Sequence, residues 1–342
     1  MRVASAFVRT RMTPTQMLRG ILAASLVLLA ACAQRMSAPP GEVFAFALIG
    51  DTPYGSGAED RFEQMLQQIN DDPSIRFVLH AGDLKGSAEP CSDQLLRRRL
   101  AQFQVVRTAL DYTPGDNDWT DCHRAGAGSH HPLERLDALR RLAYPAPGRS
   151  FGHLPLALQS QAGAPENAQF TYGRVMFVTL HVTGSNNGLE PWTAPTPAES
   201  AALRDEQMAA FRQREAANLA WLGAAFAQAS AGEAIAMVVL MHANPGFDLP
   251  PGDERRAGFE AIIDALGRLT AQFGRPVLLL HGDGHIFLVD RPLAGGSPSA
   301  PNLRRVQAFG YPWTEWIRIE VDPASGAVFR VAVGERHDVI GG

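Results

Sequence analysis

Five short apolar runs in this 342-residue chain are each followed, within a few residues, by an aspartate or a histidine. Each run has the length and composition of a buried strand, and they cover residues 43–49, 77–79, 110–112, 235–241 and 277–280. Segments with helical spacing of apolar residues lie between them, at 62–69, 96–106, 133–142, 198–229 and 259–273. This alternation predicts an α/β fold, in which ligands gather at the carboxyl ends of strands.

The remaining sequence suggests one large domain, which we expect to cover residues 43–335. Segment 175–180 indicates a further strand that ends at His181, while segments 316–321 and 328–333 alternate as outer antiparallel strands do. Segments rich in proline and glycine at 145–165, 184–197 and 292–301 are predicted to be surface loops. Hydrophobic residues make up 46% of the chain, enough for a large core, and the net charge of −4 gives no indication of a nucleic-acid partner.

The polar residues at the strand ends are the candidate functional residues. They are Asp51, Asp83, the run Asp116-Asn117-Asp118, His242, and Asp283 with His285. A single aspartate after a strand is often only a turn former or a helix cap. Several carboxylates and imidazoles that meet in one crevice would repel one another, and one or two divalent cations would remove that cost.

The order of these motifs resembles the calcineurin-like metallophosphoesterase superfamily. The corresponding segments are Gly50-Asp51-Thr52-Pro53, Gly82-Asp83-Leu84-Lys85, Gly115-Asp116-Asn117-Asp118, His242 and Gly282-Asp283-Gly284-His285. The resemblance implies a four-layer αββα sandwich with mixed sheets and a metal site at the carboxyl ends of the strands. It also implies two metal ions bridged by Asp83 and hydrolysis of a phosphoester by a metal-activated water.

This chain departs from the family pattern inside the motifs themselves. Pro53 stands where the family has its first histidine, and Asp283 takes the place of another. Without a gap, Asp116 is the ligand and Asn117 stands in the histidine position; with a shift of one residue, these places pass to Asn117 and Asp118. The oxygen-rich set suits Mn²⁺, Mg²⁺ or Ca²⁺ better than Zn²⁺, although iron and zinc are also compatible with the resemblance.

The resemblance therefore implies a specific distribution of ligands. The first metal would take Asp51, Asp83 and His285, and the second would take Asp83, Asp116 or Asn117, His242 and Asp283.

Further residues near the motifs are candidates for supporting roles. His123 could replace the missing general acid, or it is a solvent-exposed loop histidine. Lys85, the only lysine in the chain, could bind the substrate phosphate or lie in an exposed loop. His181 and His281 are candidates for residues that support the metal ligands, with a purely structural hydrogen-bonding role as the alternative for His181.

The N-terminal segment predicts export. Arginines precede an apolar stretch at 21–31, which is too short to span a bilayer but suits a secretory signal. The sequence Leu29-Ala30-Ala31-Cys32 resembles a bacterial lipobox, which implies a leader over residues 1–31, lipidation of Cys32 and a tether over 32–42; the alternative is an ordinary signal peptide with an incidental cysteine. We thus expect a protein anchored by its lipid in the cell envelope, with the outer membrane favoured.

The two other cysteines, Cys91 and Cys122, fit the same compartment. In an oxidising environment an isolated pair can form a disulfide, although two unpaired buried thiols are the alternative.

Three functions are compatible with these features. The first is a metal-dependent hydrolase of a phosphomonoester or phosphodiester, acting as a monomer on a phosphorylated small molecule. The second is a degenerate, non-catalytic relative that acts as a binding module at the cell surface. The third is an unrelated exported α/β protein whose acids at the strand ends are incidental.

Overall fold

A computed structural model describes residues 41–194, 196–295 and 298–333 of the protein. The described residues all belong to the same compact unit. The predicted leader and Cys32 lie outside the described residues, so export and lipidation stay predictions. Within the described residues, none of the helices combines the length and the apolar character needed to cross a membrane.

The first sheet has five strands, and its centre is formed by strands that the sequence predicts. In spatial order they are β12 (Phe329–Val333), β11 (Ile317–Val321), β1 (Phe44–Ile49), β2 (Ile75–His80) and β3 (Ala109–Tyr112). Strands β1, β2 and β3 are parallel, and β11 is antiparallel to both β1 and β12. The antiparallel pairing predicted for the last two strands is thus confirmed.

The second sheet has seven strands around a parallel centre. In spatial order they are β4 (Gln159–Gln161), β5 (Ala164–Tyr172), β6 (Val175–Thr179), β7 (Ala236–Leu240), β8 (Val277–His281), β10 (Leu303–Gln307) and β9 (Leu288–Asp290). The four strands from β6 to β10 in this order run parallel, while β5 and β9 are antiparallel to their neighbours.

Aromatic side chains join the two sheets face to face. The ring of Phe177 on β6 meets the rings of Phe46 and Phe77 edge-on, at centroid distances of 5.4 and 5.0 Å. Phe44 of β1 meets Tyr172 of β5 in the same way at 4.7 Å. Because side chains alternate along a strand, Ala45 and Ala47 of β1 point to the other face, into a second core with the helices.

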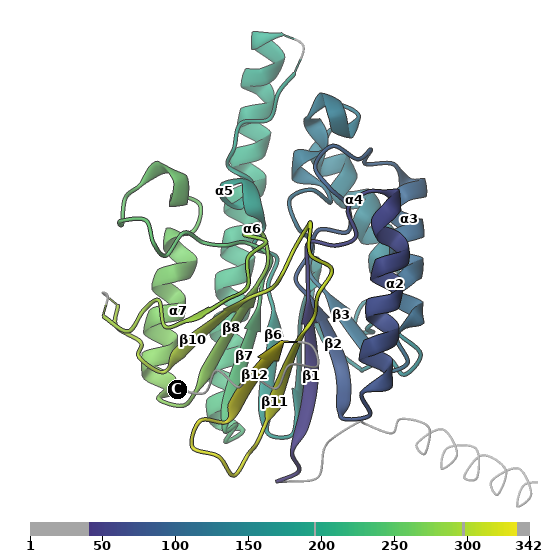
Figure 1. Ribbon diagram of the computed structural model, residues 1–342. Helices are drawn as coiled ribbons and strands as arrows, with labels where there is room; N and C mark the ends of the chain where they lie inside the picture. The colour runs from purple at the N-terminus through teal and green to yellow at the C-terminus, as the bar shows by residue number, and fades with distance from the viewer. Residues whose placement is uncertain (1–40, 195, 296–297, 334–342) are drawn as a thin grey trace, which may run out of the picture. The chain divides into compact units, whose positions relative to one another are not determined.

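Helices cover the outer face of each sheet, which gives the predicted four layers (Figure 1). The first sheet is covered by α2 (Ser56–Asp71), α3 (Asp93–Gln102) and α4 (Pro132–Ala143), and the second by α6 (Pro197–Ala231) and α7 (Glu260–Phe273). Between β6 and α6, α5 (Gly184–Gly188) is a single turn with left-handed backbone. Short 3₁₀ turns are η1 (Phe103–Val105), η2 (Thr120–His123), η3 (Ala125–Ala127) and η4 (Glu254–Arg256).

Strands β4, β5, β9 and β10 were not expected from the sequence, and the first two fall largely in or beside a predicted loop. Strand β5 lacks an apolar run because its buried side chains include Glu166, Asn167 and Gln169. Each of these has a polar partner, such as Arg140 for Glu166 and Asn218 for Asn167. A strand that buries paired polar groups in this way gives no hydrophobic signal.

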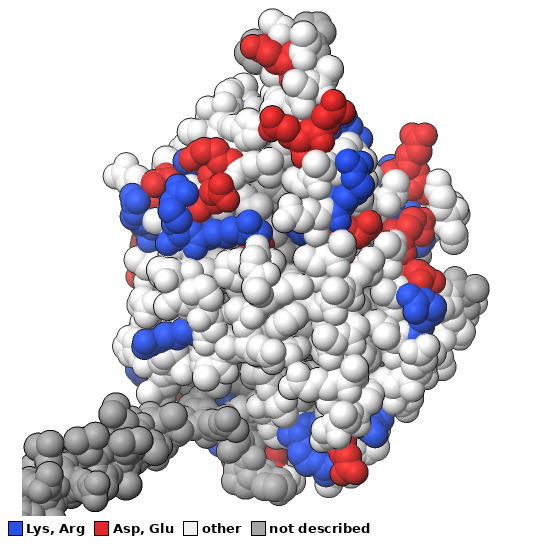
Figure 2. Space-filling view, turned by 180° about the vertical axis from the view of Figure 1, so that it is seen from behind, with Lys and Arg blue, Asp and Glu red and all other residues white. Residues whose placement is uncertain are grey.

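Charged side chains on the face shown in Figure 2 lie in mixed groups of both signs, beside a broad area without charge. This distribution agrees with the near-neutral composition.

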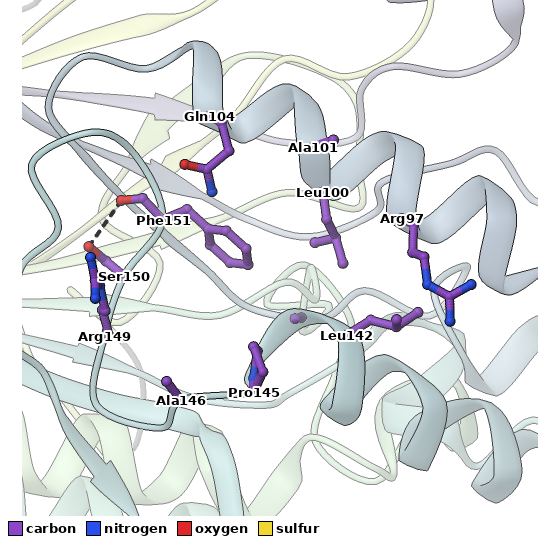
Figure 3. Close-up of a pocket in the computed structure, with 11 residues that line it drawn as sticks. Arg97, Leu100, Ala101, Gln104, Leu142, Pro145, Ala146, Arg149, Ser150 and Phe151 are labelled. Carbon is purple, nitrogen blue, oxygen red and sulfur yellow. Dashed lines mark hydrogen bonds between the residues drawn. The ribbon is translucent and has the colours of Figure 1, made fainter.

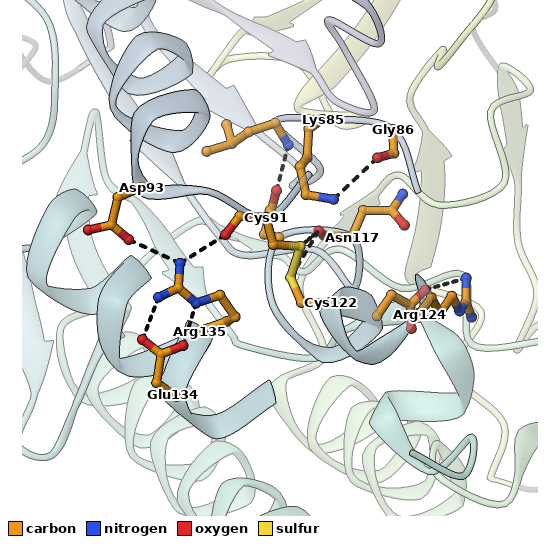
Figure 4. The surroundings of a disulfide bond; sticks show 12 residues. Lys85, Gly86, Cys91, Asp93, Asn117, Cys122, Arg124, Glu134 and Arg135 are labelled. Atoms are coloured by element: carbon orange, nitrogen blue, oxygen red, sulfur yellow. Dashed lines mark hydrogen bonds and ion pairs between the residues drawn. A yellow bond between two sulfur atoms is a disulfide. The ribbon is translucent and has the colours of Figure 1, made fainter. Parts of the chain in front are cut away.

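A disulfide joins Cys91 to Cys122, as predicted, with the two Cα atoms 5.7 Å apart (Figure 4). Cys91 precedes α3 and Cys122 lies in η2. Both sulfur atoms contact the backbone carbonyl of Asn117, at 3.7 and 3.9 Å. The disulfide thus fixes the loop after β3 to the segment before α3.

We expect the double variant Cys91→Ser/Cys122→Ser to lose about 3–4 kcal/mol of unfolding free energy, because the bond closes a loop across a sequence separation of 31 residues. Urea denaturation measures this loss. Reduced wild-type protein should show the same midpoint as the variant, and an unchanged midpoint in either sample would contradict the estimate.

Candidate metal centre

The candidate ligands lie at the carboxyl ends of parallel strands in both sheets. Asp51 follows β1, Asp83 follows β2, Asp116 follows β3, His242 follows β7, and Asp283 with His285 follows β8. The two sheets bring these ends together, so that residues from distant parts of the chain come into contact.

His242 is the centre of one group of carboxylates. Its Nε2 lies 3.0 Å from Oδ1 of Asp116 and 3.7 Å from Oδ1 of both Asp83 and Asp283. The other ring nitrogen, Nδ1, donates to the carbonyl of Ala81 at 2.6 Å. This bond leaves Nε2 of the fully buried imidazole directed at the carboxylates.

Asp51 connects a second group to the first. Its Oδ1 lies 3.4 Å from Nε2 of His285, and its two oxygens accept the backbone N–H of Asp283 at 3.1 and 3.0 Å. The hydroxyl of Tyr54 lies 3.5 Å from Oδ1 of Asp51 and donates to Oδ2 of Asp83 at 2.7 Å. The phenol therefore lies between the two carboxylates.

The backbone at four of these positions is unusual. Asp51, Asp83, Asp283 and His285 have φ of 53°, 60°, 66° and 59°, in the left-handed region that side-chain-bearing residues seldom adopt. Such conformations cost free energy and cluster at functional sites, where the surrounding structure holds them. Here they turn four side chains toward one another directly after strands.

Burial and mutual repulsion determine the protonation of the acids. Burial, aided by the charge of Asp116, raises the pKa of Asp83 well above its ordinary range and that of Asp283 to about 7. Burial would lower the pKa of His242, but the surrounding carboxylates outweigh it and raise that pKa. The imidazole of His242 in turn lowers the pKa of Asp116 against the effect of burial. The cluster thus cannot keep all of its carboxylates ionised without a cation, because one imidazole offsets only one negative charge.

The residues fit a cation. Two sets of three residues, Asp51–Asp83–His242 and Asp116–His242–Asp283, offer ligand atoms that lie within 4.8 Å of one another. Carboxylate oxygens with one or two imidazoles suit Mn²⁺, Mg²⁺ or Ca²⁺. Because Nε2 has a single lone pair, His242 can coordinate only one ion at a time.

Asn117 and Asp118 lie beside the cluster with their polar atoms engaged. The backbone N–H and Nδ2 of Asn117 donate to the two oxygens of Asp83, at 3.0 and 2.5 Å. The carboxylate of Asp118 accepts the backbone N–H groups of Asp83, Leu84 and Gly115 and the hydroxyl of Tyr112. Asp118 holds the loops together, and Asp116 presents its carboxylate to His242.

His123 and Lys85 are engaged elsewhere. His123 is buried, and its Nδ1 accepts the backbone N–H of Thr193 at 3.1 Å, so the solvent-exposed alternative is wrong. Lys85 is fully buried, with its ammonium donating to the carbonyl of Gly86 at 3.2 Å, and burial lowers its pKa. The alternative that Lys85 lies in an exposed loop is therefore wrong.

His181 and His281 are buried behind the cluster. Nδ1 of His281 bonds the carbonyl of Gly282 at 2.9 Å. Nδ1 of His181 bonds Oε1 of Glu166 at 2.8 Å, and Arg140 holds the same carboxylate. His181 thus takes part in a buried network with β5 and α4.

This network makes Glu166 important for stability. Burial would raise the pKa of Glu166 from its ordinary 4.5, but His181 and Arg140 lower it to about 2. The carboxylate therefore stabilises the fold above pH 4.5, and that contribution is lost as the pH falls toward 2.

We expect Glu166→Gln to lose about 3 kcal/mol of unfolding free energy at pH 7, because it breaks a buried ion pair. The difference from wild type should shrink by about half at pH 3. At that pH Glu166 of the unfolded chain, with an ordinary pKa of 4.5, is protonated, while the folded carboxylate, with a pKa of about 2, is still mostly ionised. Urea titrations at the two pH values measure this, and a difference independent of pH would contradict the role of the charge.

The sequence analysis missed Tyr54 and Ser185. Tyr54 is three residues after Asp51, but no spacing marks a tyrosine there as a neighbour of Asp83. The hydroxyl of Ser185 lies 2.9 Å from Oδ2 of Asp116 and from Oδ1 of Asp121. It comes from the left-handed turn α5, in a segment expected to be only a loop.

A separate cavity of about 340 Å³ lies between α3, α4 and the segment 145–151 (Figure 3). Arg97 and Arg149 line it together with apolar side chains such as Leu100 and Phe151. None of the predicted site residues belongs to it, so it is distinct from the acidic cluster.

Comparison with solved structures identifies the fold. PhoD superposes with a TM-score of 0.54 and 16% identity, over 86% of this chain and 67% of that one. The fold is of the metallophosphoesterase type. GAP50, the anchor in the inner membrane complex of Plasmodium, and purple acid phosphatase PPD1 from yellow lupin seeds are more distant. Both have TM-scores of 0.47, with identities of 11% and 12%, and they match over 87% and 89% of this chain and 87% and 54% of their own. No protein-family model matches the sequence, and no curated protein does.

Proposed function

We propose that the protein is a metal-dependent hydrolase of phosphoesters. The observation that carries this proposal is the meeting of four aspartates and two histidines, from five strand ends in two sheets, in a fold of the metallophosphoesterase type. Buried acids in such number destabilise a fold unless a cation offsets them. The substrate we propose is a phosphorylated small molecule, either a phosphomonoester or a phosphodiester.

We assign the ligands as the resemblance to the metallophosphoesterases implies, with His242 on one ion only. Asp51, Asp83 and His285 would hold one ion, and Asp83, Asp116, His242 and Asp283 would hold the other. When bound, divalent cations at such a site neutralise the phosphate oxygens and lower the pKa of water. Mn²⁺, Mg²⁺ and Ca²⁺ are the ions we favour, because oxygen donors predominate.

The protein itself contributes a rigid arrangement of ligands. His242 is oriented by the carbonyl of Ala81, Asp116 by the hydroxyl of Ser185, and Asp51 by the backbone N–H of Asp283. Hydrolysis joins the oxygen of a water to phosphorus and breaks the bond from phosphorus to the alcohol oxygen, which takes up a proton. Because the donors are fixed before the substrate binds, little reorganisation is needed during the reaction.

We also propose that the protein is exported and lipidated at Cys32, acting as a monomer at the cell envelope. The lipobox-like sequence supports the anchor, and the disulfide Cys91–Cys122 fits an oxidising compartment. Mass spectrometry of the protein from bacterial membranes tests this, with a diacylglyceryl group on Cys32 as the expected result.

The activity is tested with a panel of substrates and metals. The chain from residue 33 onward, freed of metal by a chelator, should hydrolyse 4-nitrophenyl phosphate or bis(4-nitrophenyl) phosphate only after Mn²⁺, Mg²⁺, Ca²⁺ or Zn²⁺ is added. Full activity in the chelator would contradict the metal requirement. Absence of turnover with every metal, in protein shown to be folded by circular dichroism, would contradict the proposal that the protein is an enzyme.

A further inference from the structure

We infer that the site accepts phosphoesters whose alcohol carries a flat aromatic ring, such as a nucleobase; this rests on the proposed function. Large hydrophobic side chains are exposed at only six positions among the described residues. Four of the six lie in two segments near the site. Ile286 and Leu288 come directly after His285, and Tyr311 and Trp313 follow β10. We call Tyr54, Tyr311 and Trp313 the aromatic rim.

The rim is attached directly to the candidate ligands. The backbone N–H of Tyr311 donates to the carbonyl of Asp51 at 3.1 Å, and Nδ1 of His285 bonds the carbonyl of Tyr311 at 2.9 Å. Gly310 packs so closely that an added Cβ would lie 2.5 Å from Cβ of Asp51. A group that covers the rim is therefore next to a phosphate bound at the ion that Asp51 and His285 would hold.

The aromatic rings form a stack that begins at the acids. The rings of Tyr54 and Tyr311 are stacked, with centroids 5.7 Å apart and planes inclined by 20°. The hydroxyl of Tyr54 bonds Asp83, and its ring meets the ring of His285 at 5.5 Å. Tyr311 is still 50% exposed and Trp313 is 58% exposed. The stack thus leads outward from the metal centre and ends in the ring of Tyr311, which is open to solvent, and the exposed ring of Trp313 lies two residues further along the chain.

The geometry of this stack favours a flat ring over an alkyl chain. Aromatic rings at such distances attract another ring in offset or edge contact, beyond the effect of burial alone. Stacking of a nucleobase on an aromatic side chain contributes about 1–3 kcal/mol. Applied to the transition state, this corresponds to a gain of roughly 5- to 150-fold in kcat/KM.

The experiment compares adenosine 5′-monophosphate with ribose 5-phosphate, in the presence of the metal that supports activity. Both substrates break the same bond to a ribose 5′-oxygen, so that only the base differs. We expect kcat/KM to be at least 5-fold higher for the nucleotide. Tyr311→Ala and Trp313→Ala should reduce this ratio, whereas Leu154→Ala, which removes a side chain with 57% exposure outside the rim, should leave it unchanged.

Each outcome decides the inference. Equal kcat/KM for the two substrates, or a ratio that survives both rim substitutions, would overturn it, while the proposed function would stand. If kcat/KM rises as much from ethyl phosphate to hexyl phosphate as from ribose 5-phosphate to the nucleotide, the rim is a general apolar surface, and this result would also overturn the inference. If no substrate is hydrolysed, the proposed function fails, and calorimetric titration then decides: tighter binding of the nucleotide than of ribose 5-phosphate supports the rim, and equal binding overturns it.

Discussion

Asp83→Asn is expected to lower kcat/KM for phosphoester hydrolysis by about a thousandfold, with the fold intact. Asp83 lies between the two groups of ligands, with Oδ1 near His242 and Oδ2 bonded by Tyr54. The amide has nearly the same shape but lacks the charge that would hold two cations. A loss of several kcal/mol of transition-state stabilisation corresponds to that factor.

The matched control is Asp264→Asn. Asp264 is an exposed residue of α7 that pairs with Arg268, and its substitution should leave kcat/KM unchanged. Thermal unfolding should show that Asp83→Asn stays folded, because the amide keeps nearly the shape of the carboxylate at this position. Wild-type turnover in folded Asp83→Asn protein would refute the bridging role.

Gly115→Ala should be the most damaging of the small substitutions. A Cβ built at Gly115 would lie 2.0 Å from Oδ1 of Asp83 and 2.6 Å from its backbone nitrogen. Because that neighbour is partly backbone, it cannot move aside without displacing the loop after β2. We expect a decrease in kcat of about a hundredfold or more, since a displacement of about 1 Å in a catalytic group has that effect.

Gly223→Ala provides the comparison for this glycine. Gly223 lies in the middle of α6, with nothing within 4 Å of an added Cβ. Alanine there should raise the unfolding free energy by about 1 kcal/mol and leave turnover unchanged. Equal kinetics for Gly115→Ala and wild type would show that the acids do not need their present spacing.

The sequence predicted the parts of the fold that depend on local patterns. Strands β1, β2, β7 and β8 each contain a continuous apolar run, and the polar residues after them fall at the carboxyl ends because parallel strands share one edge. Strand β5 escaped prediction because its buried Glu166 and Asn167 find partners on α4 and α6, far away in the sequence. A pattern that looks polar locally becomes a core strand only when those partners are in place.

The site was predictable in its residue types but less so in its details. The strand ends indicated which acids would meet, whereas the sequence left open whether Asp116 or Asn117 is the ligand. That difference depends on the backbone N–H groups of Asp83 and Leu84, which bind Asp118 and leave Asp116 directed at His242. The contact from Tyr54 to Asp83 likewise depends on the left-handed backbone at both Asp51 and Asp83.

The most direct measurement is anomalous X-ray diffraction from crystals soaked in MnCl₂. The account predicts one or two anomalous peaks among the side chains of Asp51, Asp83, Asp116, His242, Asp283 and His285, each at about 2.0–2.6 Å from its oxygen and nitrogen ligands. A well-ordered crystal of the soaked protein with no peak at these residues would contradict the claim that the acids are brought together to hold metal.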